Sequence, residues 1–400
     1  MLFFKKKKDK QELLPLGLYL HIPFCIKKCN YCDFLSAPAT DATREQYVEA
    51  LCKEIRSHKE TTKEYELKTV YFGGGTPSLL SSVQVEQILQ AVTDTFSINM
   101  EEAEVTMEVN PGTVSKERLE AYRKLGINRL SIGVQSAREE ELKLLGRIHT
   151  FEEAKQCYRW ARKAGFTNIS MDVISALPGQ SLSDYKETLE ELISLNPEHI
   201  SSYSLIIEEK TPFYELYSEG KEKETDLPDE DTDREMYSYT KERLRAAGYE
   251  RYEISNYAKP GFESRHNSSY WTGIPYIGAG LGASSLFTNA RYHNEMDLSS
   301  YMEAIQKGED VRRDIERLVE AEKMEEFMML GLRMMKGVSR EEFQKKFGCA
   351  METVYGPALA KLRKNGLITV EGDTVALTET GIDVSNQVFI EFIPDEFVRR

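Results

Sequence analysis

The sequence predicts an α/β protein in which a parallel sheet of six strand–helix units is followed by a smaller α+β domain. Three observations predict this. Short runs rich in β-branched residues alternate with longer amphipathic segments between residues 17 and 205, as in parallel strands joined by helical crossovers. After residue 311 the order changes to helices followed by a hairpin. A chain of 400 residues, 40% hydrophobic and 30% charged, can also bury a sizeable core.

The six units can be placed along the chain. The expected strands cover residues 18–22, 69–72, 103–109, 129–133, 168–173 and 199–204. The helical segments between them cover residues 43–57, 82–95, 115–125, 151–164 and 183–195. Gly126 and Gly165 directly follow two of these helices, where glycine often ends a helix. Six such units fit either an open doubly wound sheet or a curved, incomplete barrel, and periodicity does not choose between them.

Composition divides the chain into four regions. Residues 1–11 form a basic tail, and residues 12–245 form the core domain, with a last helix expected from residue 236. Residues 246–310 are rich in glycine, asparagine, serine and aromatic residues, which predicts irregular structure packed on the core. Residues 311–385 predict a second domain that resembles a winged-helix module. Its expected elements are a Met-rich helix over 318–335, helices over 340–347 and 351–365, and a hairpin turning at Gly372 and Asp373.

Charge and hydropathy exclude several classes of protein. The formal charge is −14, from 66 acidic and 52 basic residues, and a field of that sign repels nucleic acid and anionic lipid. No run approaches the roughly 18 apolar residues of a membrane span. The stretch after the first lysines is too short and too polar for a signal peptide. We therefore expect a cytoplasmic protein that binds no nucleic acid and touches membranes at most peripherally, through its basic tail.

Three of the six cysteines, Cys25, Cys29 and Cys32, fall within eight residues directly after the first expected strand. Close cysteines in a cytosolic chain indicate a metal or redox site rather than disulfides. Three thiolates can ligate a 4Fe–4S cluster and leave one iron without a protein ligand. Zinc is the alternative, but a closed structural zinc site needs four ligands. The nearest candidate for a fourth, His21, lies within the expected strand.

A glycine run, Gly73 to Gly75, followed by Thr76 and Pro77, comes directly after the second expected strand. Glycines let a backbone approach a ligand closely and expose its polar groups. The GxxxxGK(S/T) spacing of a phosphate loop is absent. A tight turn with no ligand is the alternative interpretation.

Polar side chains end the remaining strands of the core. Glu108, Gln135, Asp172 and Tyr203 each lie at or just after the end of one strand. Because the carboxyl ends of barrel strands face one shared pocket, these side chains are expected to meet there. Arg147, twelve residues after Gln135, could hold a carboxylate in a bidentate pair. Loop hydrogen bonds and a surface arginine are the alternatives.

These motifs together resemble the radical SAM superfamily. The CxxxCxxC spacing begins at the end of an HIPFC turn and is followed by GGGTPS, MEVNPG, GVQS and MDVISALPGQ segments, which are similar to the coproporphyrinogen-oxidase-like branch. The resemblance implies an incomplete (β/α)6 barrel with a HemN-type C-terminal domain over 311–385. It also implies a 4Fe–4S cluster whose free iron binds S-adenosylmethionine and whose reduction cleaves it. The residues implied to contact S-adenosylmethionine are Tyr19, Tyr31, Gly74, Gly75, Thr76, Glu108, Gln135, Arg147 and Asp172.

Two features separate the haem chaperones of this branch from its dehydrogenases. The dehydrogenase pattern has a fourth cysteine two residues after the third, where this chain has Phe34. The chaperones share an HNxxYW motif, which here is HNSSYW. Imidazole is a common axial ligand of haem iron, and tyrosine and tryptophan offer flat apolar surfaces. The implied haem contacts are His266, Asn267, Tyr270 and Trp271. A packed aromatic loop with a satisfied histidine is the alternative.

The sequence therefore favours a haem chaperone that binds haem and transfers it to an acceptor protein. The alternative is an oxygen-independent coproporphyrinogen III dehydrogenase, a radical SAM oxidative decarboxylase of haem biosynthesis. No residue is assigned a catalytic role, and coproporphyrinogen oxidation is not expected. The resemblance further implies a flavodoxin- or ferredoxin-type reductant and a homodimer.

Overall fold

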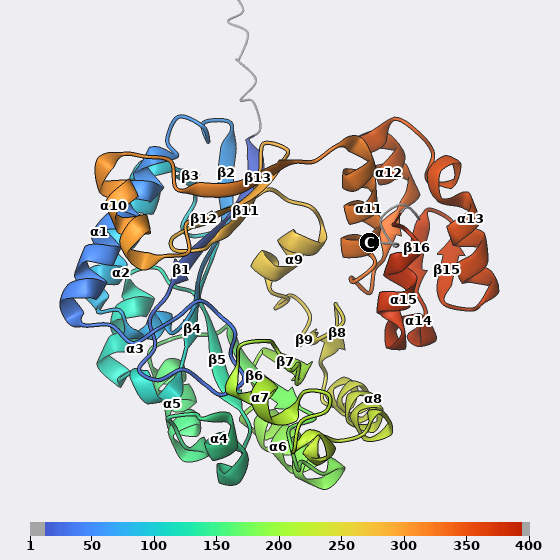
Figure 1. Ribbon diagram of the computed structural model, residues 1–400, viewed down its shortest axis with the longest axis horizontal. Helices are drawn as coiled ribbons and strands as arrows, with labels where there is room; N and C mark the ends of the chain where they lie inside the picture. The colour runs from blue at the N-terminus through green and yellow to red at the C-terminus, as the bar shows by residue number, and fades with distance from the viewer. Residues whose placement is uncertain (1–12, 394–400) are drawn as a thin grey trace, which may run out of the picture.

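The structure is a computed structural model that describes residues 13–393. It contains all six expected strands, and they are parallel neighbours in chain order. Figure 1 shows them as a curved sheet with helices on its outer side. The strands are β1 (Leu14–Ile22), β2 (Tyr65–Gly74), β4 (Glu104–Val109), β5 (Arg129–Gln135), β6 (Ile169–Ser175) and β7 (His199–Ser204). The short β3 (Ser97–Ile98) pairs with the start of β2.

Helices cover the convex face of this sheet. They are α1 (Asp41–Ser57), α2 (Ser82–Thr95), α3 (Lys116–Lys124), α5 (Phe151–Lys163) and α6 (Leu182–Leu195). Capping boxes at Ser81, Thr150 and Ser181 satisfy backbone N–H groups at three helix starts. The seven-residue α4 (Glu139–Leu145) was not expected, since it is too short for a periodic pattern. The charged segment before residue 236 contributes to α8 (Glu230–Ala246), which Asp229 caps, and α7 (Pro212–Tyr217) precedes it.

The two faces of the sheet differ in chemistry. Leu18 on β1 and Leu130 on β5 are fully buried on the convex face, within the core between sheet and helices. The intervening residues point the other way, because side chains alternate along a strand. On that concave side lie buried polar groups such as Thr69, Arg129 and Ser170. The barrel interior is therefore polar, while the hydrophobic core lies outside it.

The prediction that residues 246–310 are irregular is wrong. Strands in this segment extend both edges of the sheet: β10 pairs in parallel with β1, and β9 pairs with β7. The elements are β8 (Glu250–Arg251), β9 (Asn256–Ala258), α9 (Arg265–Trp271), β10 (Tyr276–Ala279), β11 (Ser284–Phe287), β12 (Ala290–Asn294) and α10 (Leu298–Lys307). The strands have two to five residues, which is too few for a period-2 pattern to stand out.

The C-terminal domain has the expected order of helices and hairpin, and its own hydrophobic core around Phe343 and Met328. Its elements are α11 (Glu320–Gly331), β14 (Val338–Ser339), α12 (Arg340–Phe347), α13 (Met351–Lys364), β15 (Ile368–Glu371), β16 (Thr374–Leu377), α14 (Glu379–Asp383) and α15 (Ser385–Ile390). The boundary expected at residue 311 needs correction, because β13 (Arg312–Arg317) pairs with β12 in the main sheet. The expected Met-rich helix over 318–335 is shorter in the structure, where α11 ends at Gly331.

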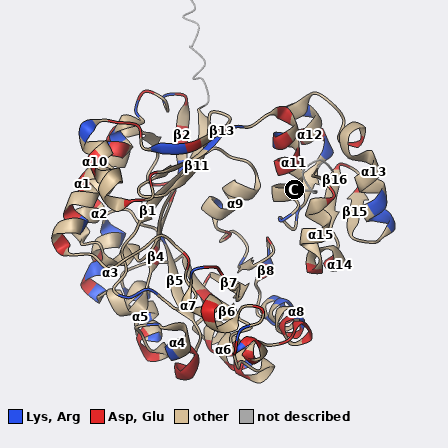
Figure 2. Cartoon of the chain, viewed as in Figure 1, with Lys and Arg blue, Asp and Glu red and all other residues tan. Residues whose placement is uncertain are grey.

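Charges of both signs are spread over the outer helices and the C-terminal domain (Figure 2). Within residues 13–393, no helix combines the length and apolar character needed to cross a membrane. The basic tail, residues 1–11, lies outside the described residues.

Candidate functional site

The strand ends bring the cysteine motif, the glycine run and the polar residues to one rim of the barrel. The cysteines lie on a loop of residues 23–37, here named the cluster loop, which joins β1 to α1. Two backbone hydrogen bonds close its base: the Cys25 N–H donates to Ala37 O at 3.1 Å and the Ala37 N–H donates to Pro23 O at 3.0 Å. The loop is thus held at both ends while its cysteines stay at the rim.

Two side chains from other loops of the rim approach the cysteine thiols. Thr76 Oγ1 lies 3.4 Å from Cys25 Sγ, and the Arg147 guanidinium lies 3.5 Å from Cys29 Sγ. Burial raises the pKa of Cys32 to about 11. Among residues 13–393, no three His, Cys, Asp or Glu side chains converge as the ligands of a single metal ion do. A 4Fe–4S cube makes a different demand, because each thiolate binds its own iron atom.

The glycine run is required by its contact with the cluster loop. A Cβ atom on Gly74, which has a φ of +108°, would lie 2.6 Å from the His21 ring. A Cβ atom on Gly75 would lie 2.8 Å from Phe24 O. Only glycine lets the end of β2 pack this closely against the end of β1 and the start of the cluster loop.

A buried carboxylate, Glu108, lies beside this run at the end of β4. It accepts hydrogen bonds from the Tyr71 hydroxyl at 2.9 Å and from the Gly74 N–H at 3.2 Å. Burial raises the pKa of Glu108 to about 7. A carboxylate taken out of water in this way favours a cationic ligand, which would restore its ionised form. S-adenosylmethionine carries positive charge on its amino group and its sulfonium.

The end of β5 is strained, and the candidate anion-binding group, the Arg147 guanidinium, is hydrogen-bonded to it. Gln135 has a φ of +72°, and the pairing of β5 with β6 shifts register between Gly133 and Gln135. Strained non-glycine residues of this kind cluster at functional sites. One Arg147 nitrogen donates to Gly133 O at 2.7 Å, while its buried Nε has no partner. Tyr31 lies beside this guanidinium, and burial raises the pKa of the tyrosine.

Asp172 lies on the interior wall of the barrel. It accepts hydrogen bonds from Ser131 Oγ at 2.9 Å and Ser170 Oγ at 3.0 Å, and burial raises its pKa. The charge of Asp172 raises the pKa of Glu108 and the charge of Arg129 lowers it. All three groups therefore face the same barrel interior. Tyr203 is 41% exposed at the end of β7.

The HNSSYW motif forms α9, which lies on the concave side of the sheet (Figure 1). His266 is 1% exposed. Its Nδ1 lies 2.8 Å from Thr69 Oγ1, its Nε2 lies 2.8 Å from the Tyr270 hydroxyl, and its ring stacks on Tyr71 at 4.9 Å. Burial lowers the pKa of His266 to about 3. In this conformation both ring nitrogens are satisfied by the protein, as in the satisfied-histidine alternative.

The four predicted haem contacts do not share one face. His266 and Tyr270 point into the barrel, where Tyr270 packs edge-on against Tyr276 at 4.6 Å. Trp271 instead lies under the Arg333 guanidinium of the C-terminal domain, at 4.3 Å. Asn267, the residue after His266 on α9, is half-buried.

Comparison with known proteins agrees with these observations. Residues 19–192 match the Radical SAM superfamily, and residues 318–384 match the HemN C-terminal domain. Heme chaperone HemW of Lactococcus lactis is 37% identical over 382 residues, covering 96% of this chain and 98% of that protein. HemW of Escherichia coli is 37% identical, covering 92% of this chain and 96% of that protein. The chain belongs to the HemW family.

A solved structure confirms the fold of this HemW-family chain. Coproporphyrinogen III oxidase (HemN) from Escherichia coli superimposes with a TM-score of 0.84 at 24% sequence identity, covering 96% of this chain and 91% of that one. The likeness concerns the fold alone. The radical SAM barrel with a HemN-type C-terminal domain is therefore confirmed, and the open doubly wound sheet is set aside.

Sequence reasoning missed two residues of the candidate site. Tyr71 bridges Glu108 and His266, and Arg129 is fully buried beside the two interior carboxylates. Tyr71 could have been found from its position two residues before Gly73, on the same strand face. Arg129 could have been found as the one charged residue of its strand.

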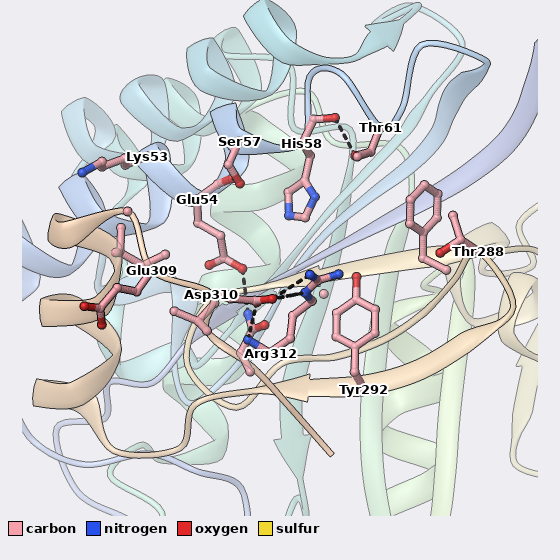
Figure 3. Close-up of a pocket in the computed structure, with 16 residues that line it drawn as sticks. Lys53, Glu54, Ser57, His58, Thr61, Thr288, Tyr292, Glu309, Asp310 and Arg312 are labelled. Carbon is pink, nitrogen blue, oxygen red and sulfur yellow. Dashed lines mark hydrogen bonds and ion pairs between the residues drawn. The ribbon is translucent and has the colours of Figure 1, made fainter. Parts of the chain in front are cut away.

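A separate cavity of about 440 Å³ lies away from the rim, among α1, β11, β12 and the segment after α10 (Figure 3). His58, Tyr292 and Arg312 line it together with Glu54. Glu54 accepts hydrogen bonds from the Gly280 N–H at 2.9 Å and Asn294 Nδ2 at 2.7 Å. The Glu54 carboxylate therefore fastens the β10–β12 extension to α1.

Proposed function

We propose that this protein is a haem chaperone, which binds haem and transfers it to an acceptor protein. The observation that carries the proposal is its match, over 96% of its length, to a protein named heme chaperone HemW. Two local features support it: Phe34 stands where the dehydrogenase pattern has a cysteine, and HNSSYW occupies α9.

We further propose that Cys25, Cys29 and Cys32 hold a 4Fe–4S cluster and that the rim binds S-adenosylmethionine. When bound, this pair supplies one-electron chemistry. Glu108 is suited to accept a hydrogen bond from the methionine amino group, since its carboxylate is buried. Arg147, whose Nε is unpartnered, is suited to pair with the methionine carboxylate. Tyr19, Tyr31, Gly74, Gly75, Thr76, Gln135 and Asp172 complete the proposed contacts.

For haem, we propose the neighbourhood of α9, between the barrel and the C-terminal domain. Trp271 and Asn267 are half-buried there, and Trp271 offers a flat face. His266 can ligate iron only after α9 shifts, because its Nε2 lies 2.8 Å from the Tyr270 hydroxyl. Haem capture through His266 is thus proposed as a step that moves α9.

The remaining proposals concern partners and location. Cluster thiolates require a reducing compartment, so we propose a cytoplasmic protein served by a flavodoxin- or ferredoxin-type reductant. We also propose a homodimer, no nucleic-acid partner, and membrane contact no more than peripheral.

The test is an anaerobic optical titration of the cluster-reconstituted protein with haem. We expect a saturable Soret shift at about one haem per chain, and transfer of that haem to an apo-haemoprotein. Trp271→Ala should weaken haem binding, while His58→Ala, on the far cavity, should not. Absence of saturable binding would contradict the chaperone proposal, and turnover of coproporphyrinogen III would replace it with the dehydrogenase.

A further inference from the structure

A continuous chain of contacts joins the HNSSYW helix to the proposed S-adenosylmethionine site. The ring of His266 stacks on Tyr71 at 4.9 Å with 22° between the ring planes. The Tyr71 hydroxyl donates to Glu108 at 2.9 Å. Tyr19 is a second aromatic neighbour of Tyr71, and the centroids of these two rings lie 6.2 Å apart. The Tyr71 ring therefore lies between a residue of β1 and a residue of α9.

His266 is itself fixed on three sides. Its two ring nitrogens are hydrogen-bonded to Thr69 and Tyr270, both at 2.8 Å. The backbone N–H groups of Arg265 and His266 donate to the carboxylate of Glu104, each at 3.0 Å. Thr69 is on the strand that carries Tyr71, and Glu104 is on the strand that carries Glu108. Helix α9 is thus anchored to the same two strands as the carboxylate that it approaches.

We propose that His266 is a positioning residue of the S-adenosylmethionine site, which holds Tyr71 and, through it, Glu108. The inference rests on the proposed cofactor site and assigns the HNSSYW histidine a task there that does not depend on haem. Removing the imidazole frees the Tyr71 ring and its hydroxyl, so Glu108 loses a fixed donor and its orientation. By linkage, anything that draws His266 out of the barrel weakens S-adenosylmethionine binding, and bound S-adenosylmethionine holds His266 in.

The test measures S-adenosylmethionine affinity by anaerobic calorimetric titration of the cluster-reconstituted protein, without haem. We expect His266→Ala to weaken binding about tenfold and Tyr71→Phe to weaken it by a similar factor. The double variant should be no weaker than the more affected single variant, because both changes interrupt one path. His266→Phe keeps the stacked ring and should recover most of the affinity. This rescue separates positioning of Tyr71 from a general loss of packing.

His58→Ala is the matched control, since His58 lies at the distant cavity and should leave the affinity unchanged. Cluster absorbance and thermal unfolding of each variant report whether it is loaded and folded. If His266→Ala does not fold, Tyr270→Phe, which removes only the hydroxyl bonded to Nε2, should still weaken binding about threefold. Wild-type affinity in folded His266→Ala, or fully additive losses in the double variant, would overturn the proposal. Because haem is absent, failure of haem transfer leaves this result unaffected.

Discussion

The convex and concave faces of the same six strands perform different tasks. Outward residues such as Leu18 and Leu130 are fully buried against helices, and burial of such side chains is the main source of stability. Inward residues such as Tyr71, Glu108 and Asp172 are buried with polar partners, where burial raises the pKa of the carboxylates. One strand can thus stabilise the fold with one face and build a ligand site with the other. Changes on the two faces should separate stability from binding.

The largest effect is expected at the rim, where both faces end. Cys29→Ala should abolish the visible absorbance of the cluster on reconstitution, because only two of the three thiolates that attach the cluster to the protein would remain. Cys157→Ala is the matched control, since Cys157 is fully buried in the convex core. An ordinary cluster spectrum in Cys29→Ala would contradict the ligand assignment.

On the convex face, Leu130→Ala should lower the free energy of unfolding by about 2–5 kcal/mol, the usual cost of a cavity left by a buried leucine. Denaturant unfolding of the unloaded protein measures this. The affinity of the folded variant for S-adenosylmethionine should stay close to that of the wild type. A large loss of affinity at unchanged stability would show that the faces are not independent.

On the concave face, Glu108→Gln should have the opposite profile. Loss of the carboxylate charge should weaken S-adenosylmethionine by about tenfold or more, since charged hydrogen bonds contribute about 1.5–3 kcal/mol. The free energy of unfolding should not fall, because the amide keeps the shape, can still accept from Tyr71 and carries no buried charge. Calorimetric titration beside denaturant unfolding gives both quantities, and unchanged affinity would remove Glu108 from the site.

The last expected effect is a pH dependence of the unloaded protein. The pKa of Glu108 is about 7 in the fold against 4.5 for an ordinary glutamate, so between these values the folded state binds a proton that the unfolded state has released. Glu108 should therefore contribute a fall in stability as pH rises from about 4.5 to about 7, which opposes the rise contributed by buried histidines such as His266, whose pKa is lowered to about 3. Glu54, whose pKa burial also raises to about 7, contributes to the same fall. Glu108→Gln should gain stability relative to the wild type as pH rises from about 4.5 to about 7. A difference in stability that stays constant over this pH range would contradict this assignment.

Local patterns account for what could be predicted. The six parallel strands and five of the crossover helices follow from β-branched runs and helix caps, which act within a few residues. The segment from 246 to 310 was misread because its strands are short and gain their order by pairing with β1 and β7. The unexpected α4 is likewise too short to give a period. The rim residues were predictable as a set because parallel strands end at one edge.

The sequence by itself determined the alternation of strands and helices, the spacing of the three cysteines and the glycine run, because each depends on neighbouring residues. Only the tertiary structure decided that the HNSSYW helix enters the barrel, with His266 bonded to Thr69, 197 positions earlier in the chain. A contact across that separation leaves no local pattern. It forms because the polar concave face supplies the hydrogen-bond partners that a buried imidazole requires.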